Sequence, residues 1–117
     1  MIGNRQTAFK IRISDLLSGT YCREQGEWDP NHVLVSDMKV SRVNIIATVV
    51  DKYVNVDLSY ASLELDDGSN KIVVKAWKDD VGLVNQIAVG SLVLCIGRVR
   101  EFNDSIYLTP EIIKELS

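Results

Sequence analysis

A long run of β-branched residues limits what this chain can fold into more than any other feature. Segment 40–56 (VSRVNIIATVVDKYVNV) contains a stretch of about fourteen residues with strand character, roughly twice the usual strand length of about 5–6 residues. A strand of this length normally bends and joins two sheets. The long strand therefore favours an all-β fold that is built around it.

Two hairpins and a short helix follow the long strand. Segments 59–65 (SYASLEL) and 71–77 (KIVVKAW) flank a turn, DDGSN, in which Gly68 permits a positive φ. The apolar spacing within 81–90 predicts a short helix with Asp79 or Asp80 as its N-cap. Segments 92–102 and 105–111 form a second hairpin about Asn103-Asp104, and Thr109-Pro110 predicts the start of a final helix.

Five strands with a helix between the third and the fourth predict an OB-fold, a small Greek-key barrel. A β-sandwich is the alternative, but it would need more regularly spaced strands and no internal helix. We expect residues 1–37 to form an extension that packs on the barrel, 38–109 to form the OB core, and 110–117 to begin a C-terminal helix. Within the extension we expect a strand at 8–13, a helical turn that Ser14 caps, and a loose hairpin over 20–36.

Gly97 interrupts the regular alternation of the fourth strand. Leu92, Leu94 and Ile96 share their parity with two cations, Arg98 and Arg100. A β-bulge at Gly97 that exchanges the inward and outward faces would explain this pattern.

Composition bears on which kinds of partner, cofactor and activity this chain can have. The 117 residues fit one domain, and the net charge of −3 argues mildly against a polyanionic partner. Cys22 and Cys95 lack metal-ligand spacing, and His32, which we expect to be exposed, is the only histidine. We therefore expect no metal, no cofactor and no enzymatic activity. The free cysteines and the absence of a long apolar run predict a cytoplasmic, intracellular protein without a membrane segment.

The third strand carries the clearest binding pattern. Its even positions are aliphatic or small and suit a barrel interior, whereas its odd positions include Lys71, Lys75 and Trp77. An exposed indole can stack on a nucleobase, at about 1–3 kcal/mol per base, while lysines contact phosphates. The alternative is that Trp77 closes the end of the barrel and the lysines only contribute solubility.

The end of the fourth strand repeats this combination beside the same groove. The candidate nucleic-acid-binding residues are Trp77, Phe102, Lys71, Lys75, Lys78, Arg98, Arg100 and Asn103. Ranges 71–78 and 98–103 together hold five cations and one acid, a net charge of +4 in a chain whose total is −3. Tyr53, Tyr60 and Tyr107 either extend the stacking surface or pack in the fold, and Trp28 is interpreted as a lid on the barrel end.

Five segments of the chain resemble one family. They are ISDLLSG (13–19), GEWDPN (26–31), VSRVNIIATVV (40–50), LELDDGSNKIVVKAW (63–77) and GSLVLCIGRVREFND (90–104). Their order and spacing resemble the OB domain of the middle subunit of replication protein A, particularly its archaeal members. The resemblance runs from Phe9 to Leu116.

The resemblance implies sequence-tolerant binding of single-stranded DNA in replication, repair and recombination, at the nucleoid. The family's stacking aromatics match Trp77 and Phe102. It also implies partner subunits of a replication protein A-like hetero-oligomer, contacted through a C-terminal helix with Ile112, Ile113 and Leu116. Two alternatives stay open: an assembly module with little DNA binding of its own, and an OB domain that binds RNA.

Overall fold

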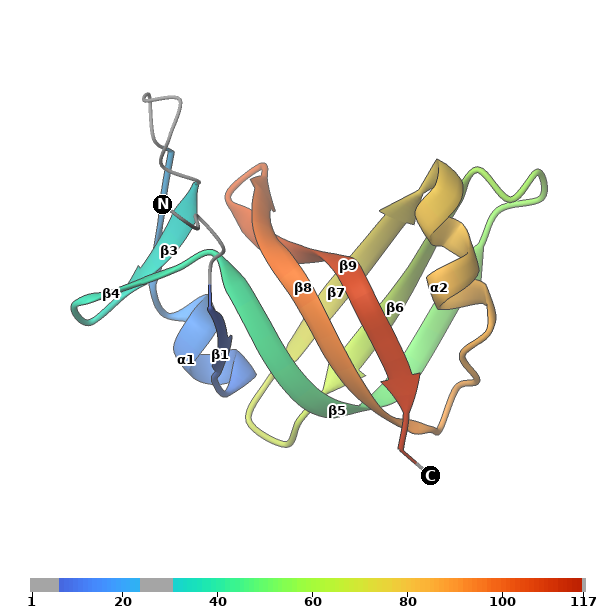
Figure 1. The fold of residues 1–117 in the computed structure, drawn as a ribbon, viewed down its shortest axis with the longest axis horizontal. Coiled ribbons are helices and arrows are strands. Elements are labelled where there is room, and N and C mark those ends of the chain that lie inside the picture. The colour runs from blue at the N-terminus through green and yellow to red at the C-terminus, as the bar shows by residue number, and fades with distance from the viewer. Residues whose placement is uncertain (1–6, 24–30, 117) are drawn as a thin grey trace.

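The long strand is β5 (Arg42–Val54), and it contributes to two sides of a barrel. Residues 42–48 of β5 pair with β8 (Leu92–Phe102), and residues 48–54 pair with β6 (Tyr60–Asp66). The computed structural model describes residues 7–23 and 31–116 (Figure 1). The long strand therefore pairs with a different strand along each half, but within one sheet that closes on itself and not between two separate sheets.

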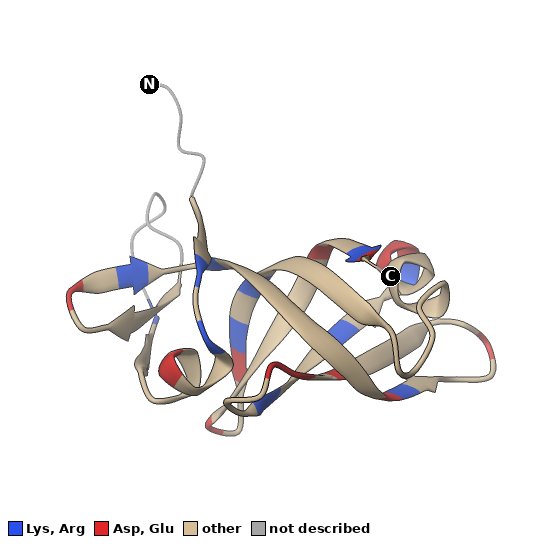
Figure 2. Ribbon diagram, turned by 90° about the horizontal axis from the view of Figure 1, so that it is seen from below, with Lys and Arg blue, Asp and Glu red and all other residues tan. Residues whose placement is uncertain are grey.

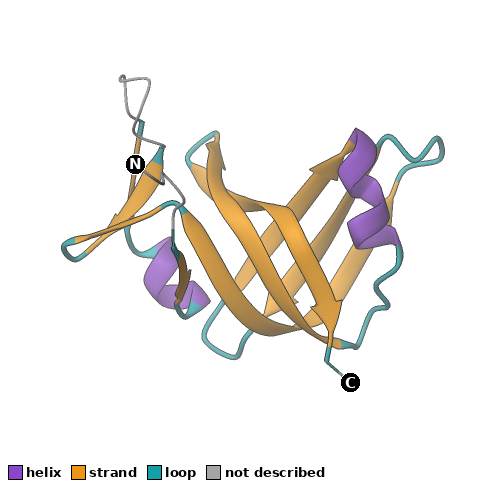
Figure 3. Cartoon of the chain, viewed as in Figure 1, coloured by secondary structure: helices purple, strands orange, loops and turns teal. Residues whose placement is uncertain are grey.

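The barrel is closed and five-stranded. Its strand order is β5-β6-β7-β9-β8, with β7 at Lys71–Trp77 and β9 at Ser105–Glu115, and β5 closes the ring by pairing with β8. Between β7 and β8 lie a short 3₁₀ helix, η1 (Lys78–Asp80), and α2 (Val81–Asn85), which covers part of one side of the barrel (Figure 3). This arrangement confirms the predicted OB-fold.

Alternation along the strands builds the core. The odd positions of β6, the even positions of β7 and the odd positions of β8 are buried, as period 2 requires. Fully buried side chains from α1, α2 and the barrel join in one cluster, which includes Ile13, Leu16, Ile45, Leu63, Val74, Val84 and Leu108.

The N-terminal region packs beside the barrel. β1 (Ala8–Lys10) pairs in parallel with the start of β5, and α1 (Ile13–Leu17) follows it. β2 (Thr20–Cys22), β3 (His32–Val35) and β4 (Met38–Val40) form a separate antiparallel sheet to one side of the barrel (Figure 1). His32 is buried at the start of β3, so the expectation that it is exposed was wrong. The interpretation of Trp28 as a lid falls outside the described residues.

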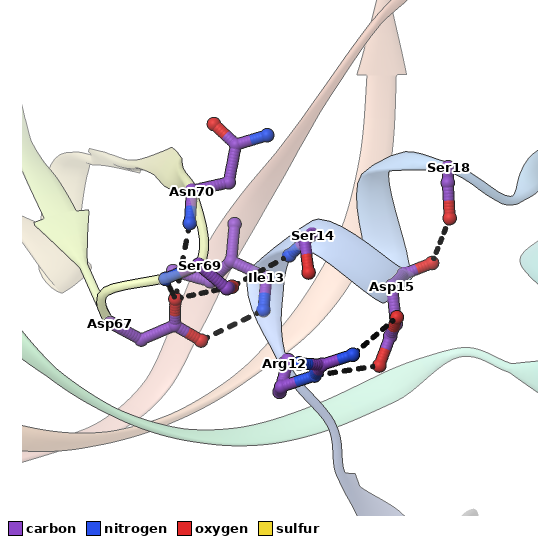
Figure 4. A network of polar contacts seen from close by, with 8 residues as sticks. All are labelled: Arg12, Ile13, Ser14, Asp15, Ser18, Asp67, Ser69 and Asn70. Atoms are coloured by element: carbon purple, nitrogen blue, oxygen red, sulfur yellow. Dashed lines mark hydrogen bonds and ion pairs between the residues drawn. The ribbon is translucent and has the colours of Figure 1, made fainter.

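The turn between β6 and β7 caps α1. The Asp67 carboxylate accepts a hydrogen bond from the backbone N of Ile13 at 2.8 Å, and Ser69 Oγ accepts one from the backbone N of Ser14 at 3.0 Å (Figure 4). The predicted cap, Ser14, lies inside the helix, and the N-cap position is Arg12, which makes no side-chain capping bond. The free N–H groups of α1 are thus satisfied from a distant turn.

The expected C-terminal helix was wrong. Residues 110–115 continue β9, which pairs with β8 up to Val93 and Glu115. The backbone N of Leu116 then donates to the carbonyl oxygen of Leu92 at 2.8 Å. Pro110 starts no helix here because it lies beside a bulge, where a strand tolerates a residue without an N–H.

That bulge lies on β9, opposite Gly97. Ile96 pairs with Ile112 and Gly97 pairs with Pro110, so Glu111 is the extra residue. The alternation of β8 continues unbroken through Gly97, because Cys95 and Val99 are both buried. The bulge therefore lies on the partner strand and not at Gly97 itself, and the expected exchange of faces on β8 does not occur. Leu92, Leu94 and Ile96 lie on the outer face together with the arginines.

Candidate nucleic-acid interface

A row of aromatic rings crosses the outside of the barrel. Tyr60 and Trp77 are directly opposite one another on β6 and β7, with ring centroids 5.3 Å apart. Tyr53 on β5 lies 6.1 Å from Tyr60, and Tyr107 on β9 lies 6.3 Å from Trp77, edge to face. With Phe102, which Lys75 connects to Tyr107, we call these five residues the aromatic row.

The row offers its rings to solvent. Tyr53, Trp77 and Phe102 are 55%, 45% and 63% exposed. Burial of a large aromatic ring is strongly favourable, so three exposed rings in one connected row form an unusual surface. The interpretation of Trp77 as a plug in the barrel end is inconsistent with this placement.

A bulge on β5 places Tyr53 in the row. The odd residues from Val43 to Val49 are buried, so unbroken alternation would turn Tyr53 into the core. The pairing with β6 shifts between Val49 and Asp51, and Val50 is the extra residue. The parity reverses beyond Val50, and Tyr53 points outward.

Lys75 on β7 links Tyr107 on β9 to Phe102 at the end of β8. Its Nζ lies 4.5 Å from the centroid of the Tyr107 ring and 6.0 Å from that of Phe102. A cation over aromatic faces is attracted by the ring quadrupoles. Lys75 therefore holds a positive charge between two rings, where it can contact a phosphate while bases stack beside it.

The turn between β8 and β9 places Phe102 at the end of the row. Asn103 and Asp104 have φ values of 51° and 65°, as the two central residues of a type I′ hairpin turn require. Phe102 pairs with Ser105 directly before this turn. Asn103, a candidate binding residue, thus has a conformational role in the hairpin.

The opposite end of the row is a rigid turn between β5 and β6. Asn55 Oδ1 accepts hydrogen bonds from the backbone N atoms of Ser59 and Tyr60 at 2.9 and 3.0 Å. Asp57 Oδ1 accepts from Ser59 Oγ at 2.7 Å and from its backbone N at 3.2 Å, and these bonds lower the pKa of the Asp57 carboxyl. The bonded turn fixes the strand ends that carry Tyr53 and Tyr60.

The predicted cations divide into two groups. Lys75 lies over two rings of the row, Lys78 follows Trp77 directly, and Arg100 is opposite Tyr107 in the pairing of β8 with β9. Lys71 is at the other end of β7, opposite Asp66 and about 20 Å from Trp77 at about 3.3 Å per residue. Arg98 pairs with Glu111 at 3.1 Å. Cations and acids are scattered over the barrel strands (Figure 2), and the structure does not assemble all five cations into one patch.

The residues expected to contact partner subunits do not lie on a helix. Ile113 is buried in the barrel core at 5% exposure, whereas Ile112 and Leu116 are exposed at the C-terminal end of β9. The side chain of Ile113 is therefore not available at the surface.

Metal-ligating groups, cysteine and helix length can be described within residues 7–23 and 31–116. No group of three or more His, Cys, Asp or Glu side chains there is placed to hold a metal ion. Burial raises the pKa of the Cys95 thiol to about 12, which leaves it protonated at neutral pH. None of the helices in this part of the chain has the length and apolar character required to cross a membrane.

Comparison with known proteins finds similar structures but no similar sequence family. No family model and no curated protein sequence matches the chain. A chain of the Stn1-ten1 complex of S. pombe superposes with a TM-score of 0.79 at 16% identity, over 95% of this chain and 79% of that one. The comparison supports the OB-fold at an identity too low to carry function.

Two chains of replication protein A are also similar. A chain of a replication protein A heterotrimer bound to single-stranded DNA gives a TM-score of 0.74 at 14% identity, with 96% of this chain and 83% of that chain covered. Yeast replication protein A bound to single-stranded DNA gives 0.70 at 19% identity, with 100% and 82% covered. The likeness extends over nearly the whole chain.

Proposed function

We propose that this chain binds single-stranded DNA on the aromatic row, with little dependence on sequence. One observation carries the proposal: five aromatic rings, one from each strand of the barrel, form a connected surface that is partly open to solvent, with Lys75 over two of them. Every nucleobase has a π-face, so such a surface stacks bases of any sequence and excludes paired bases.

The charge distribution supports modest, salt-sensitive binding. Lys75, Lys78 and Arg100 lie along the row, while the chain as a whole carries a net charge of −3. Each phosphate that a cation contacts releases counterions, so affinity falls as salt rises. With few cations on the row, most of the binding free energy has to come from stacking.

The finer assignment rests on the resemblance and on the similar structures. We propose a subunit of a replication protein A-like complex of the archaeal middle-subunit type, non-enzymatic, with other subunits as partners. Its place is intracellular, in replication, repair and recombination. Support comes from the structural likeness to replication protein A chains and to the Stn1-ten1 complex.

Fluorescence anisotropy of a labelled oligo-dT tests the binding proposal. Replacing both Trp77 and Phe102 with alanine removes two of the most exposed rings, so we expect affinity at constant salt to fall by a few kcal/mol. Met38→Ala is the matched control, because Met38 is exposed on β4, away from the row. Its affinity should equal that of the unaltered chain.

Parallel titrations with single-stranded RNA and duplex DNA define the ligand. We expect binding to single strands and none to duplex. Equal affinity for RNA would mean that the aromatic row binds both nucleic acids, since a protein distinguishes RNA from DNA by contacts to the 2′-OH. A folded Trp77→Ala/Phe102→Ala variant that binds oligo-dT as tightly as the unaltered chain would refute the proposal.

A further inference from the structure

Four cations continue the path of the aromatic row around the barrel. The row crosses β5, β6, β7 and β9 and ends on β8, whose other neighbour is β5, with β1 beside it. On this side of the barrel, Arg98 on β8 is directly opposite Arg42 on β5, and Lys10 lies on β1. We define the basic strip as Arg100, Arg98, Arg42 and Lys10. The strip begins at the row, because Arg100 is opposite Tyr107.

The basic strip lies on the outer face of the sheet. The even residues of β8 and of the first half of β5 point outward, because the odd residues are buried. Lys10 is exposed, pairs with Asn44 on β5 and lines a hollow over the outer face together with it. Same-face neighbours along a strand are about 7 Å apart, and adjacent strands are about 5 Å apart. The long side chains of the strip can therefore contact one continuous polyanion.

One acid lies within the basic strip. Glu111, the extra residue of the bulge on β9, contacts Arg42 through Oε1 at 2.7 Å and Arg98 through Oε2 at 3.1 Å. The strip and Glu111 together hold four cations and one acid, a net charge of +3. Within residues 7–23 and 31–116, neither Lys10 nor Arg100 has an ion-pair partner. The strip is thus positive in spite of Glu111.

The contacts of Glu111 show how this part of the strip receives an oxyanion. Two guanidinium groups from different strands are directed at one carboxylate, a group that resembles phosphate in charge and in its acceptor oxygens. Arg98 is 39% exposed and contacts Glu111 through Nε. Because a guanidinium carries further N–H donors, Arg98 can hold Glu111 and contact a phosphate from solvent at the same time.

We propose that the basic strip binds the sugar-phosphate backbone of a single strand where the strand leaves the aromatic row. This inference rests on the proposed binding of single-stranded DNA by the row. The row has five rings and few cations, whereas the strip consists of cations alone. Nucleotides on the strip therefore add affinity through their phosphates, in a manner that depends on salt and not on the base.

Oligo-dT of two lengths separates the strip from the row in anisotropy titrations. OB domains bind about 4–16 nucleotides, so an oligomer of about 5 nucleotides contacts the row alone and one of about 16 also reaches the strip. Lys10→Gln removes an exposed cation of the strip. With the long oligomer we expect affinity at low salt to fall on the order of fivefold, and the slope of log affinity against log salt to fall by about 1. With the short oligomer, both should stay unchanged.

Two further variants make the test specific to the strip. Lys71→Gln is the matched control, because Lys71 is an exposed lysine opposite Asp66 at the far end of β7 and should change neither titration. Glu111→Gln removes the acid and keeps the shape of the side chain. We expect it to bind the long oligomer more tightly with a steeper salt slope, whereas a merely loosened strand pair would bind it less tightly.

Circular dichroism establishes that each variant is folded. Folded Lys10→Gln and Glu111→Gln variants that both bind the long oligomer with the affinity and salt slope of the unaltered chain would overturn the strip. Binding of the short oligomer would then still support the row. An unaltered chain that binds neither oligomer would refute the proposed function, and the strip with it.

Discussion

Asp67 and Ile13 are 54 residues apart in the sequence, yet the Asp67 carboxylate accepts a hydrogen bond from the Ile13 backbone N at 2.8 Å. The same carboxylate accepts bonds from Ser69 Oγ at 2.6 Å and from the Ser69 backbone N at 2.9 Å. One side chain thus shapes the β6–β7 turn and caps α1. It joins the N-terminal region to the barrel.

Removal of this carboxylate should loosen the N-terminal region. Asp67→Ala leaves N–H groups of α1 and of the turn without partners, and we expect a loss of about 1–2 kcal/mol in the free energy of unfolding. Chemical denaturation measures it. Asp66→Ala is a comparison on the same turn. Within the part of the chain that the structure describes, the Asp66 carboxylate accepts one hydrogen bond, from the backbone N of Gly68 at 2.8 Å, so its loss should cost less.

The same carboxylate makes stability depend on pH. Partial burial by itself would raise the pKa of Asp67, but the hydrogen bonds from Ser69, Ile13 and Asn70 outweigh it and lower the pKa. A lowered folded-state pKa gives stability that is complete above the ordinary carboxyl pKa of about 4 and is lost as the pH falls through the folded value. Unfolding free energies measured between neutral and acidic pH should therefore fall less steeply in Asp67→Asn than in the unaltered chain. Equal slopes would refute this role.

Gly97 is required by the close approach of β9. A Cβ at this position would lie 2.7 Å from the backbone oxygen of Thr109. We expect Gly97→Ala to destabilise the barrel by about 1–3 kcal/mol, because backbone has to move. Gly82→Ala is the matched control: no atom lies within 4 Å of its added Cβ, and alanine in a helix should stabilise by up to about 1 kcal/mol. Thermal unfolding of both variants checks the pair.

The two lysines of β7 should differ in DNA binding. Lys75 lies over Tyr107 and Phe102, so Lys75→Gln should reduce the slope of log affinity against log salt by about 1. Lys71 faces Asp66 at the far end of the strand, so Lys71→Gln should leave the slope unchanged. Titrations at several salt concentrations measure both. A larger effect at Lys71 would place the binding surface elsewhere.

Local patterns were sufficient to predict most of the barrel. Period-2 alternation placed Trp77 on the outer face of β7, and Asn103-Asp104 predicted a two-residue hairpin turn. The features that these patterns did not predict depend on pairing between strands that are distant in the sequence. Thr109-Pro110 has the residues of a helix start, but β8 supplies a partner strand that continues β9 to Glu115.

The candidate site was likewise predicted where alternation within one strand was enough, and missed where the pairing of strands was needed. Trp77 and Lys75 follow from alternation within one strand. Tyr53 does not, because the bulge at Val50 depends on how β5 pairs with β6. The pairing of Arg98 with Glu111 likewise depends on the register of β8 and β9, so sequence position alone grouped Arg98 with the binding cations.

Fluorescence of Trp77 tests the central claim most directly. The chain has two tryptophans, so Trp28→Phe leaves Trp77 as the only one. Titration of this variant with oligo-dT should quench the emission in a saturable manner, more weakly at higher salt, because a base stacks on the indole. Duplex DNA should have no effect. Unchanged emission at oligo-dT concentrations that saturate binding by anisotropy would contradict stacking on the aromatic row.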